Sequence, residues 1–143
     1  MPRRHPGPPY KFHFDACLGG RRIVEFCEKI GLEGQVFRAH ASVYDDGTLD
    51  TVWLPECATH GWVICTSDSQ ILRCKAECEE VWRHDGVLVV FSERLSTDAL
   101  EALLEKHLSG IRGHLQAAKP PFLLRVTSRG LARFKPERAC PTP

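Results

Sequence analysis

Three aspartates are the residues of this sequence whose type and position most directly suggest chemistry. Asp15 directly follows the short apolar stretch of residues 11–14, and Asp68 comes shortly after another at residues 62–65. The carboxyl ends of parallel strands meet at one edge of an open α/β sheet, and ligands bind at that edge. We therefore expect Asp15 and Asp68 to lie beside a functional site.

Asp50 is the third of these acids, and it stands at the expected start of a helix. Each aspartate alone has an ordinary structural explanation, as a turn residue or a helix cap. Three carboxylates at one edge, however, repel one another unless a cation or protons compensate. Magnesium prefers oxygen ligands, usually one or two carboxylates with waters and substrate phosphates. The pattern predicts a magnesium site at which a metal-activated water attacks a phosphodiester bond.

Positive charge gathers near the end of the chain, although the formal net charge is only +1. Residues 119–138 contain six cations and a single acid, whereas acidic residues concentrate between positions 77 and 105. Phosphate contacts supply most of the nonspecific affinity for nucleic acid, which makes RNA a suitable partner. A solvated strand face with alternating charge explains the same pattern equally well. The six cations are Lys119, Arg125, Arg129, Arg133, Lys135 and Arg138.

The length of 143 residues, with 43% apolar and 26% charged residues, predicts one globular domain at residues 11–135 between flexible tails at 1–10 and 136–143. No apolar stretch is long enough for a membrane span, and the first residues lack the apolar segment of a secretory signal. The seven cysteines show no paired C-x-x-C framework, which favours free thiols in a reducing compartment. We expect a cytoplasmic protein without membrane association.

Apolar periodicity predicts alternating strands and helices followed by a hairpin. Pro55 is tolerated only in the first turn of a helix, which leaves the start of the second helix open by a few residues. Ser96 has the position of a helix N-cap, and the leucine stripe behind it predicts a long helix packed on the core. The expected strands are 11–15, 35–40, 62–65 (central in the sheet), 87–91, 122–127 and 131–135. The expected helices cover residues 20–30, 50–60 and 71–83, and the long helix follows Ser96 and is broken by Pro120 and Pro121.

Three blocks of the sequence, in this order, resemble a known family. They are Phe-Asp-Ala-Cys-Leu at residues 14–18, Gly-Thr-Leu-Asp-Thr-Val-Trp-Leu-Pro at 47–55 and Gly-Trp-Val-Ile-Cys-Thr-Ser-Asp at 61–68. The succession resembles the PIN-like domains related to VapC-type toxins of toxin-antitoxin systems, and the similarity continues through residues 73–77 and 120–127. It covers nearly the whole chain apart from the tails.

This resemblance implies a three-layer α/β/α PIN-like fold with a central, mainly parallel sheet, to which the predicted C-terminal β-hairpin is added. It also implies an Mg²⁺- or Mn²⁺-dependent endoribonuclease. Asp15, Asp50 and Asp68 match the acidic metal ligands, and Thr66 matches the hydroxyl residue that helps to orient the third acid. Related toxins pair with a small antitoxin that blocks the site and often form homodimers, so both partners are implied for this chain.

The sequence departs from the family pattern at its acids. The second acid of PIN domains is often glutamate, whereas Asp50 is one methylene shorter, which shifts the ion or introduces a bridging water. A fourth acid is common in the family, and several residues of this chain are candidates. They are Asp46, Glu77, Asp85 and Glu93.

Two alternatives stay open. A catalytically inactive PIN-like module would bind RNA or a protein, and its sign would be aspartates paired with arginines such as Arg21 or Arg73. A phosphoacceptor switch at Asp15 would need an acidic pair just upstream and a lysine after a later strand, and the sequence offers neither convincingly.

The remaining metal-binding or aromatic side chains are expected to be structural. Cys74, Cys78 and His84 lack the second ligand pair of a zinc site. His13 lies between two apolar strand residues and is expected to be a satisfied side chain at the surface or edge rather than a general base. Two of the three tryptophans are expected in the core.

Overall fold

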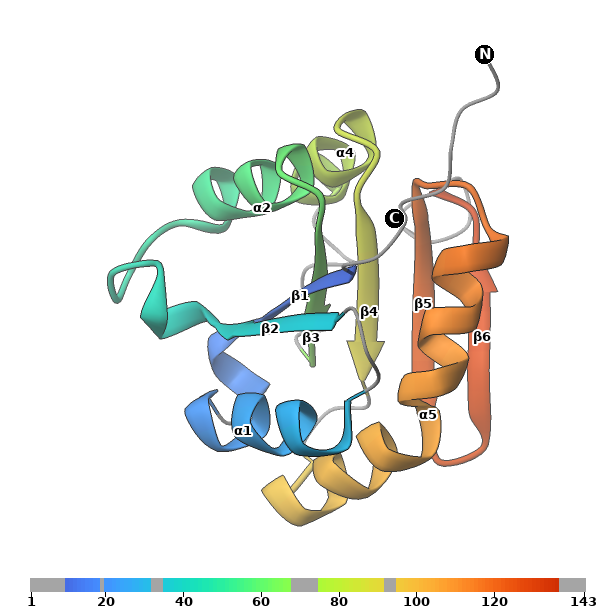
Figure 1. Ribbon diagram of the computed structural model, residues 1–143. Coiled ribbons are helices and arrows are strands. Elements are labelled where there is room, and N and C mark those ends of the chain that lie inside the picture. The colour runs from blue at the N-terminus through green and yellow to red at the C-terminus, as the bar shows by residue number, and fades with distance from the viewer. Residues whose placement is uncertain (1–9, 19, 32–34, 68–74, 92–94, 137–143) are drawn as a thin grey trace.

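One six-stranded sheet organises the part of the chain that the structure describes (Figure 1). The computed structural model describes residues 10–18, 20–31, 35–67, 75–91 and 95–136. The strand order is β2-β1-β3-β4-β5-β6, in which β6 alone runs antiparallel, to β5. The strands are β1 (Tyr10–Phe14), β2 (Gln35–Ala39), β3 (Trp62–Thr66), β4 (Val87–Phe91), β5 (Phe122–Thr127) and β6 (Gly130–Phe134).

The inner strands are apolar because helices cover both of their faces. All five residues of β4 are buried, as are four of the five residues of β3. A parallel strand packed on both sides has no solvated face and therefore reads as a continuous apolar run. β3 lies between β1 and β4, which confirms its predicted central position.

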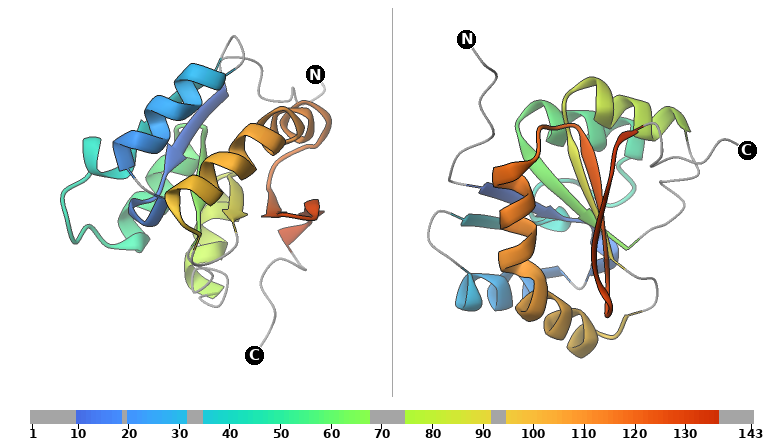
Figure 2. Two further views of the ribbon diagram at one scale, coloured as in Figure 1. Left: turned by 90° about the horizontal axis from the view of Figure 1, so that it is seen from below. Right: turned by 90° about the vertical axis from the view of Figure 1, so that its right-hand side faces the viewer.

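The described helices cover both faces of the sheet (Figure 2). The helices α1 (Gly20–Ile30) and α5 (Thr97–Ala117) pack on one face, and α2 (Asp50–Thr59) and α4 (Lys75–Arg83) pack on the other. Two short 3-10 turns, η1 (Ala16–Leu18) and η2 (His40–Ser42), follow β1 and β2. This arrangement, with the antiparallel hairpin β5–β6, confirms the predicted α/β fold.

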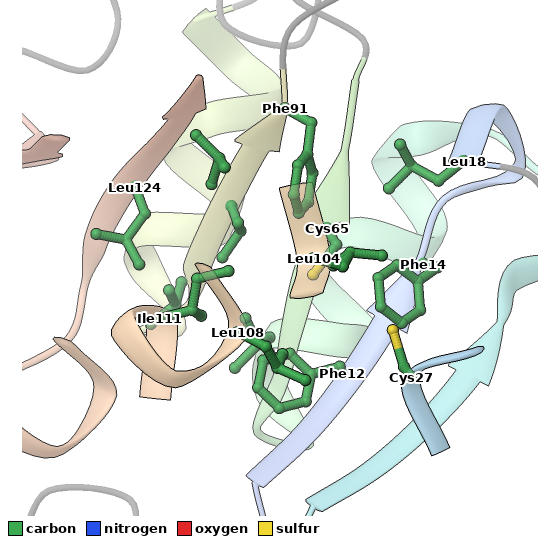
Figure 3. Packing of buried hydrophobic residues seen from close by; sticks show 14 of the residues in the cluster. Phe12, Phe14, Leu18, Cys27, Cys65, Phe91, Leu104, Leu108, Ile111 and Leu124 are labelled. Carbon is green, nitrogen blue, oxygen red and sulfur yellow. The ribbon is translucent and has the colours of Figure 1, made fainter. Parts of the chain in front are cut away.

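The larger hydrophobic core lies between the sheet and the pair α1/α5 (Figure 3). Phe12 and Phe14 of β1 point into it, next to Leu104 and Leu108 of the predicted α5 stripe, while Ile111 of the same stripe lies toward Leu124. Each fully buried side chain of this size contributes about 1.5–3 kcal/mol relative to an exposed one. This face of the sheet therefore supplies much of the stability.

Local side chains define both ends of α5. The Ser96 hydroxyl accepts a hydrogen bond from the Ala99 amide at 3.1 Å, which confirms the predicted N-cap. The helix continues through Gly110, and this glycine lies against the hairpin: a Cβ there would meet Leu131 Cδ1 at 2.8 Å. The absence of a side chain thus lets β6 approach the helix closely.

The expectation for Pro55 is wrong. α2 begins at Asp50 with Leu49 as its N-cap, so Pro55 lies beyond the first turn. Proline lacks the amide that would donate to the carbonyl of Thr51, four residues earlier. Thr51 is exposed near the start of the helix, where water can replace the missing donor.

Among the described residues there is no helix with the combination of length and apolarity that a bilayer crossing requires. The predicted tails fall almost entirely outside the described residues, so the division of the chain into one domain and two tails stays a prediction.

Candidate active site at the carboxyl edge of the sheet

Asp15 and Thr66 lie next to each other at the carboxyl ends of β1 and β3. The last residue of β1, Phe14, is in register with Cys65 of β3. The Asp15 amide then donates to the Cys65 carbonyl at 2.9 Å, which extends the ladder by one residue. Asp15 was predicted at the carboxyl edge of the sheet, directly after a strand. It lies there, beside Thr66, the last residue of β3.

The two shortest hydrogen bonds to the Asp15 carboxylate come from one backbone amide and one hydroxyl group. Oδ1 accepts a hydrogen bond from the Ala16 amide at 2.7 Å, and Oδ2 accepts one from Thr66 Oγ1 at 2.8 Å. Thr66 is fully buried, whereas Asp15 is partly exposed. None of the described basic side chains forms an ion pair with Asp15. Within the described residues the carboxylate is therefore oriented, open to solvent and without a neutralising cation.

Cys17 adds an exposed thiol to this pair. Its Sγ lies 3.7 Å from Asp15 Oδ2 and 3.6 Å from Thr66 Oγ1. Ser67 donates to the same sulfur from its hydroxyl at 3.2 Å and from its amide at 3.5 Å. The sequence analysis did not assign Cys17 to the site, although its spacing of two residues from Asp15 was a usable signal.

Asp50 is not in contact with Asp15. It is the first residue of α2, and its Oδ1 accepts a hydrogen bond from Trp53 Nε1 at 2.9 Å. Leu49, not Asp50, occupies the N-cap position. The structure thus gives Asp50 a local partner within its own helix.

Asp68, the third predicted acid, lies outside the described residues. Within the described ranges, no three histidine, cysteine, aspartate or glutamate side chains stand close enough to hold a metal ion together. The oxygen atoms of Asp15 nevertheless suit a hard cation, because Mg²⁺ is often bound through only one or two carboxylates. The described part of the site is therefore compatible with such an ion through Asp15.

His13 is not at the surface or edge, and this prediction is wrong. Its side chain is fully buried on the α2 side of the sheet. Arg38 Nε donates to its Nδ1 at 2.9 Å, so the proton of the neutral ring is on Nε2, which faces His40 Nδ1 at 3.0 Å. Burial, with Arg38 and then His40, lowers the pKa of His13 to about 3. The ring is therefore neutral near neutral pH.

Arg38 ties the edge strand β2 to this buried histidine. Besides His13, its guanidinium donates to Cys57 Sγ at 3.5 Å. Its Cζ also lies 3.8 Å from the centroid of the Trp62 ring, which is cation–π geometry. Burial raises the pKa of Cys57, so the thiol stays protonated. Arg38 is thus a structural cation with several fixed partners.

Aromatic rings connect Asp50 to His13. The Trp53 ring, whose Nε1 binds Asp50, lies 5.4 Å from the His13 ring and 4.7 Å from the His40 ring. Tyr44 stacks on His40 at 5.1 Å. Trp53 is buried, as expected for the core, and so forms a packed link between the start of α2 and the strand that carries Asp15.

Comparison with protein families gives one match. A family model described as "PIN like domain" matches residues 10–93, more than half of the chain. The chain belongs to the PIN-like domain family. No curated protein matches it, and no solved structure does. PIN-like domains are commonly nucleases, which supports a hydrolase in general.

The matched region of this PIN-like domain runs from β1 through β4. It therefore includes the Asp15–Thr66 pair, the Asp50–Trp53 pair and the buried His13. It ends before α5 and the β5–β6 hairpin, so the family match assigns nothing to these last elements.

The fold also separates the candidates for a fourth acid in this PIN-like domain. Asp85 precedes β4 and lies at the amino ends of the strands, opposite Asp15, with a positive φ of 58°. It lines a separate pocket of about 190 Å³ that also involves Trp62 and Leu115. Asp46 is exposed before α2, Glu77 lies in the first turn of α4, and Glu93 lies outside the described residues.

The soft-metal and arginine-paired alternatives gain no support from the described residues. Cys78 is completely buried, and His84 faces Glu80, with Nε2 3.9 Å from a carboxylate oxygen. Arg21 pairs with Glu25 at 3.2 Å and not with an aspartate. Cys74 and Arg73, the other residues of these alternatives, lie outside the described residues.

Proposed function

We propose that this PIN-like domain is a divalent-metal-dependent endoribonuclease that hydrolyses RNA phosphodiester bonds, with Mg²⁺ or Mn²⁺ as its cofactor. The observation that carries the proposal is the Asp15–Thr66 pair. A partly exposed carboxylate, fixed by two hydrogen bonds and free of basic partners among the described residues, stands at the carboxyl edge of a parallel sheet. Metal ligands of α/β enzymes are expected at that edge.

The two residues have different proposed roles. Asp15 binds the ion through its carboxylate oxygens. Within the described structure Oδ1 accepts one hydrogen bond, from the Ala16 amide, and Oδ2 accepts one from Thr66 and a longer one from the Cys17 thiol. Thr66 holds one of these oxygens in place and does not itself need to touch the ion, since its hydroxyl proton is directed at Asp15. A bound divalent ion supplies the charge that polarises a phosphate and lowers the pKa of water.

Asp50 and Asp68 are the proposed further ligands. Trp53 donates to one carboxylate oxygen of Asp50, which fixes the side chain while leaving its second oxygen available. The packing of Trp53 against His13 connects this acid to the strand that carries Asp15. With these ligands the buried polar groups on the α2 side act as a support that keeps the acids in place.

The test compares the purified chain with Asp15→Asn and with Glu105→Gln, a control that removes an exposed carboxylate on α5. Each protein is incubated with pooled RNA in EDTA, Mg²⁺ or Mn²⁺. We expect metal-dependent cleavage by the wild type and the control, and a loss of about a thousandfold in Asp15→Asn, because the charge that holds the ion is removed.

Equal cleavage by all three proteins would assign the activity to a contaminant. The absence of cleavage by every variant, with the wild type free of bound protein by mass spectrometry, would favour the catalytically inactive PIN-like module that binds RNA or a protein. That alternative has one supporting observation, the lack of a three-ligand cluster within the described ranges.

We further propose that the chain is related to VapC-type toxins, with a small antitoxin as its partner and a homodimer as its assembly. The resemblance of residues 14–18, 47–55 and 61–68 supports this relation. Its test is induced expression in bacterial cells, where the wild type should stop growth and Asp15→Asn should not. Continued growth with active, soluble wild-type protein would contradict the role as a toxin while leaving the nuclease intact.

A further inference from the structure

Arg125 lies in the same row of the sheet as the candidate active site. Thr66 of β3 is in register with Val90 of β4, and Val90 is in register with Arg125 of β5. On the other side, Asp15 continues β1 next to β3 through its bond to Cys65. Asp15, Thr66, Val90 and Arg125 therefore form one line across the carboxyl ends of four strands.

These residues also share a face. Ile64, Leu88 and Leu123 pack in one cluster on the α2/α4 side of the sheet. Successive side chains of a strand alternate between faces, so the residues two positions later point the same way. Thr66, which follows Ile64, and Arg125, which follows Leu123, are consequently both directed to the α2/α4 side.

Neighbouring strands are about 4.8 Å apart, so Arg125 stands roughly 10 Å from Thr66 and roughly 14 Å from Asp15 along the row. Strand side chains stand nearly perpendicular to the sheet, which preserves this lateral separation. In Figure 1 the β5–β6 turn lies at the same lower end of the sheet as the carboxyl ends of β3 and β4. One phosphate cannot contact both Asp15 and Arg125, but one RNA strand can.

Arg125 carries a positive charge at the β5 end of this row. It is exposed, and no described acidic residue forms an ion pair with it. Residues 119–136 contain five cations and no acid at all. Only the aliphatic Val90 separates Arg125 from Thr66 in the row. A guanidinium without a carboxylate partner is well suited to bind phosphate through paired hydrogen bonds.

We propose that Arg125 binds an RNA phosphate next to the scissile one, so that the RNA strand crosses the carboxyl ends of β3 and β4 between Asp15 and β5. The inference rests on the proposed nuclease function and adds a substrate-binding residue to it. Arg125 lies beyond residue 93, where the family match ends.

Arg133 provides a matched control within the same hairpin. It is in register with Leu124, a residue of the core under α5, and therefore points to the opposite face. Its guanidinium lies 3.2 Å from His114 Nδ1 of α5. Arg125→Ala and Arg133→Ala remove the same exposed charge from the same hairpin but from different faces.

The first measurement is fluorescence anisotropy with a labelled single-stranded 2′-O-methyl RNA, which resists cleavage, in the presence of Mg²⁺. We expect Arg125→Ala to bind about tenfold more weakly, because a charged hydrogen-bonded contact is lost. The slope of log K against log salt should fall by about 0.7 for one lost phosphate contact on a single strand. Arg133→Ala should bind as the wild type does.

Oligonucleotide length makes the test more specific. A dinucleotide with a single phosphate cannot reach both sites, so wild type and Arg125→Ala should bind it equally, and the difference should appear only with longer RNA. In cleavage assays Arg125→Ala should raise KM while leaving kcat nearly unchanged, because the contact is the same in substrate and transition state. Arg125→Lys should restore part of the affinity.

Several results would overturn the proposal. Unchanged binding by Arg125→Ala, or an equal loss in Arg133→Ala, would show that no specific phosphate contact exists at this row. If the wild type cleaves RNA while Arg125→Ala has normal KM and affinity, the inference fails and the nuclease stands. If the wild type neither binds nor cleaves RNA, both proposals fail together.

Discussion

The two faces of the sheet differ sharply in what they bury. The α1/α5 face is lined by apolar side chains such as Phe12, Phe14 and Leu104. The α2/α4 face also has an apolar cluster, yet it holds two of the three buried polar side chains among the described residues, His13 and Thr66, with the half-buried Arg38 bonded to His13; the third, His107, is on α5. Buried polar groups cost free energy unless they are hydrogen-bonded, so their concentration on one face separates the source of stability from the proposed chemistry.

Substitution on the apolar face should change stability and leave the site alone. We expect Leu104→Ala to lower the free energy of unfolding by about 3 kcal/mol, because it leaves a cavity in a packed core. Urea denaturation measures this loss, and Leu104→Met is the volume-conserving control. The cleavage rate per folded molecule should not change. A large drop in that rate would contradict the view that the α1/α5 face contributes stability but not activity.

The complementary change on the polar face is Thr66→Val. It keeps the shape of the side chain but removes the hydrogen bond to Asp15 Oδ2. Loss of a residue that orients a metal ligand commonly costs about tenfold to a hundredfold in activity or metal affinity. Metal titration of the cleavage rate should show this loss, with Thr66→Ser as the control that restores it. Full activity in Thr66→Val would remove Thr66 from the site.

The buried histidine should make stability depend on pH. The pKa of His13 is about 3 in the folded protein and about 6.5 when unfolded, so in this window only the unfolded chain binds the proton. Stability should therefore fall as the pH drops from 6.5 toward 3, by at most about 1.4 kcal/mol per pH unit from this group. Denaturation at several pH values measures the slope.

His13→Gln tests the origin of that slope, because glutamine can still accept the hydrogen bond from Arg38 but does not titrate. The free energy of unfolding of this variant should depend on pH less steeply than that of the wild type. The difference in slope should correspond to at most the one proton that His13 binds on unfolding. The same pH dependence in both proteins would place the titrating group elsewhere.

The smallest effect is expected at the N-cap of α5. Ser96→Ala removes the acceptor for the Ala99 amide and should cost about 1 kcal/mol. Thermal denaturation detects a change of this size, and Ser96→Asp, which can also cap, is the control. RNA cleavage at moderate temperature should be unaffected, since this helix belongs to the apolar face.

The fold was predictable where the sequence pattern reports burial directly. The runs in β3 and β4, the cap at Ser96 and the stripe of α5 were recognised because these elements face the core continuously. His13 was misjudged because alternation with Phe12 and Phe14 implies a solvated second face, whereas β1 lies between β2 and β3 with Trp53 packed against the histidine. When a strand is covered on both faces, alternating polar and apolar residues wrongly suggest that one face is exposed to solvent.

The positions of the candidate site residues were predictable only in part. Asp15 followed from its place after a strand, and Thr66 from the family resemblance, because both signals are local in sequence. The row from Thr66 to Arg125 depends on register across three strands, which no local pattern reveals. Asp85 was a candidate for the site on grounds of residue type, and only the direction of β4 assigns it to the opposite end.

Arg38 also bears on how the protein avoids aggregation. β2 and β6 are the outermost strands of the sheet in the described part of the chain, and unpaired edge strands readily recruit strands of other molecules. On β2 the guanidinium of Arg38 is directed inward onto His13 and Trp62, and on β6 the exposed Arg133 carries a second positive charge. Charges on or directed inward from an edge strand discourage pairing with another strand. These charges therefore protect the sheet from edge-to-edge pairing with another sheet. We expect any dimer of this chain to form through other surfaces.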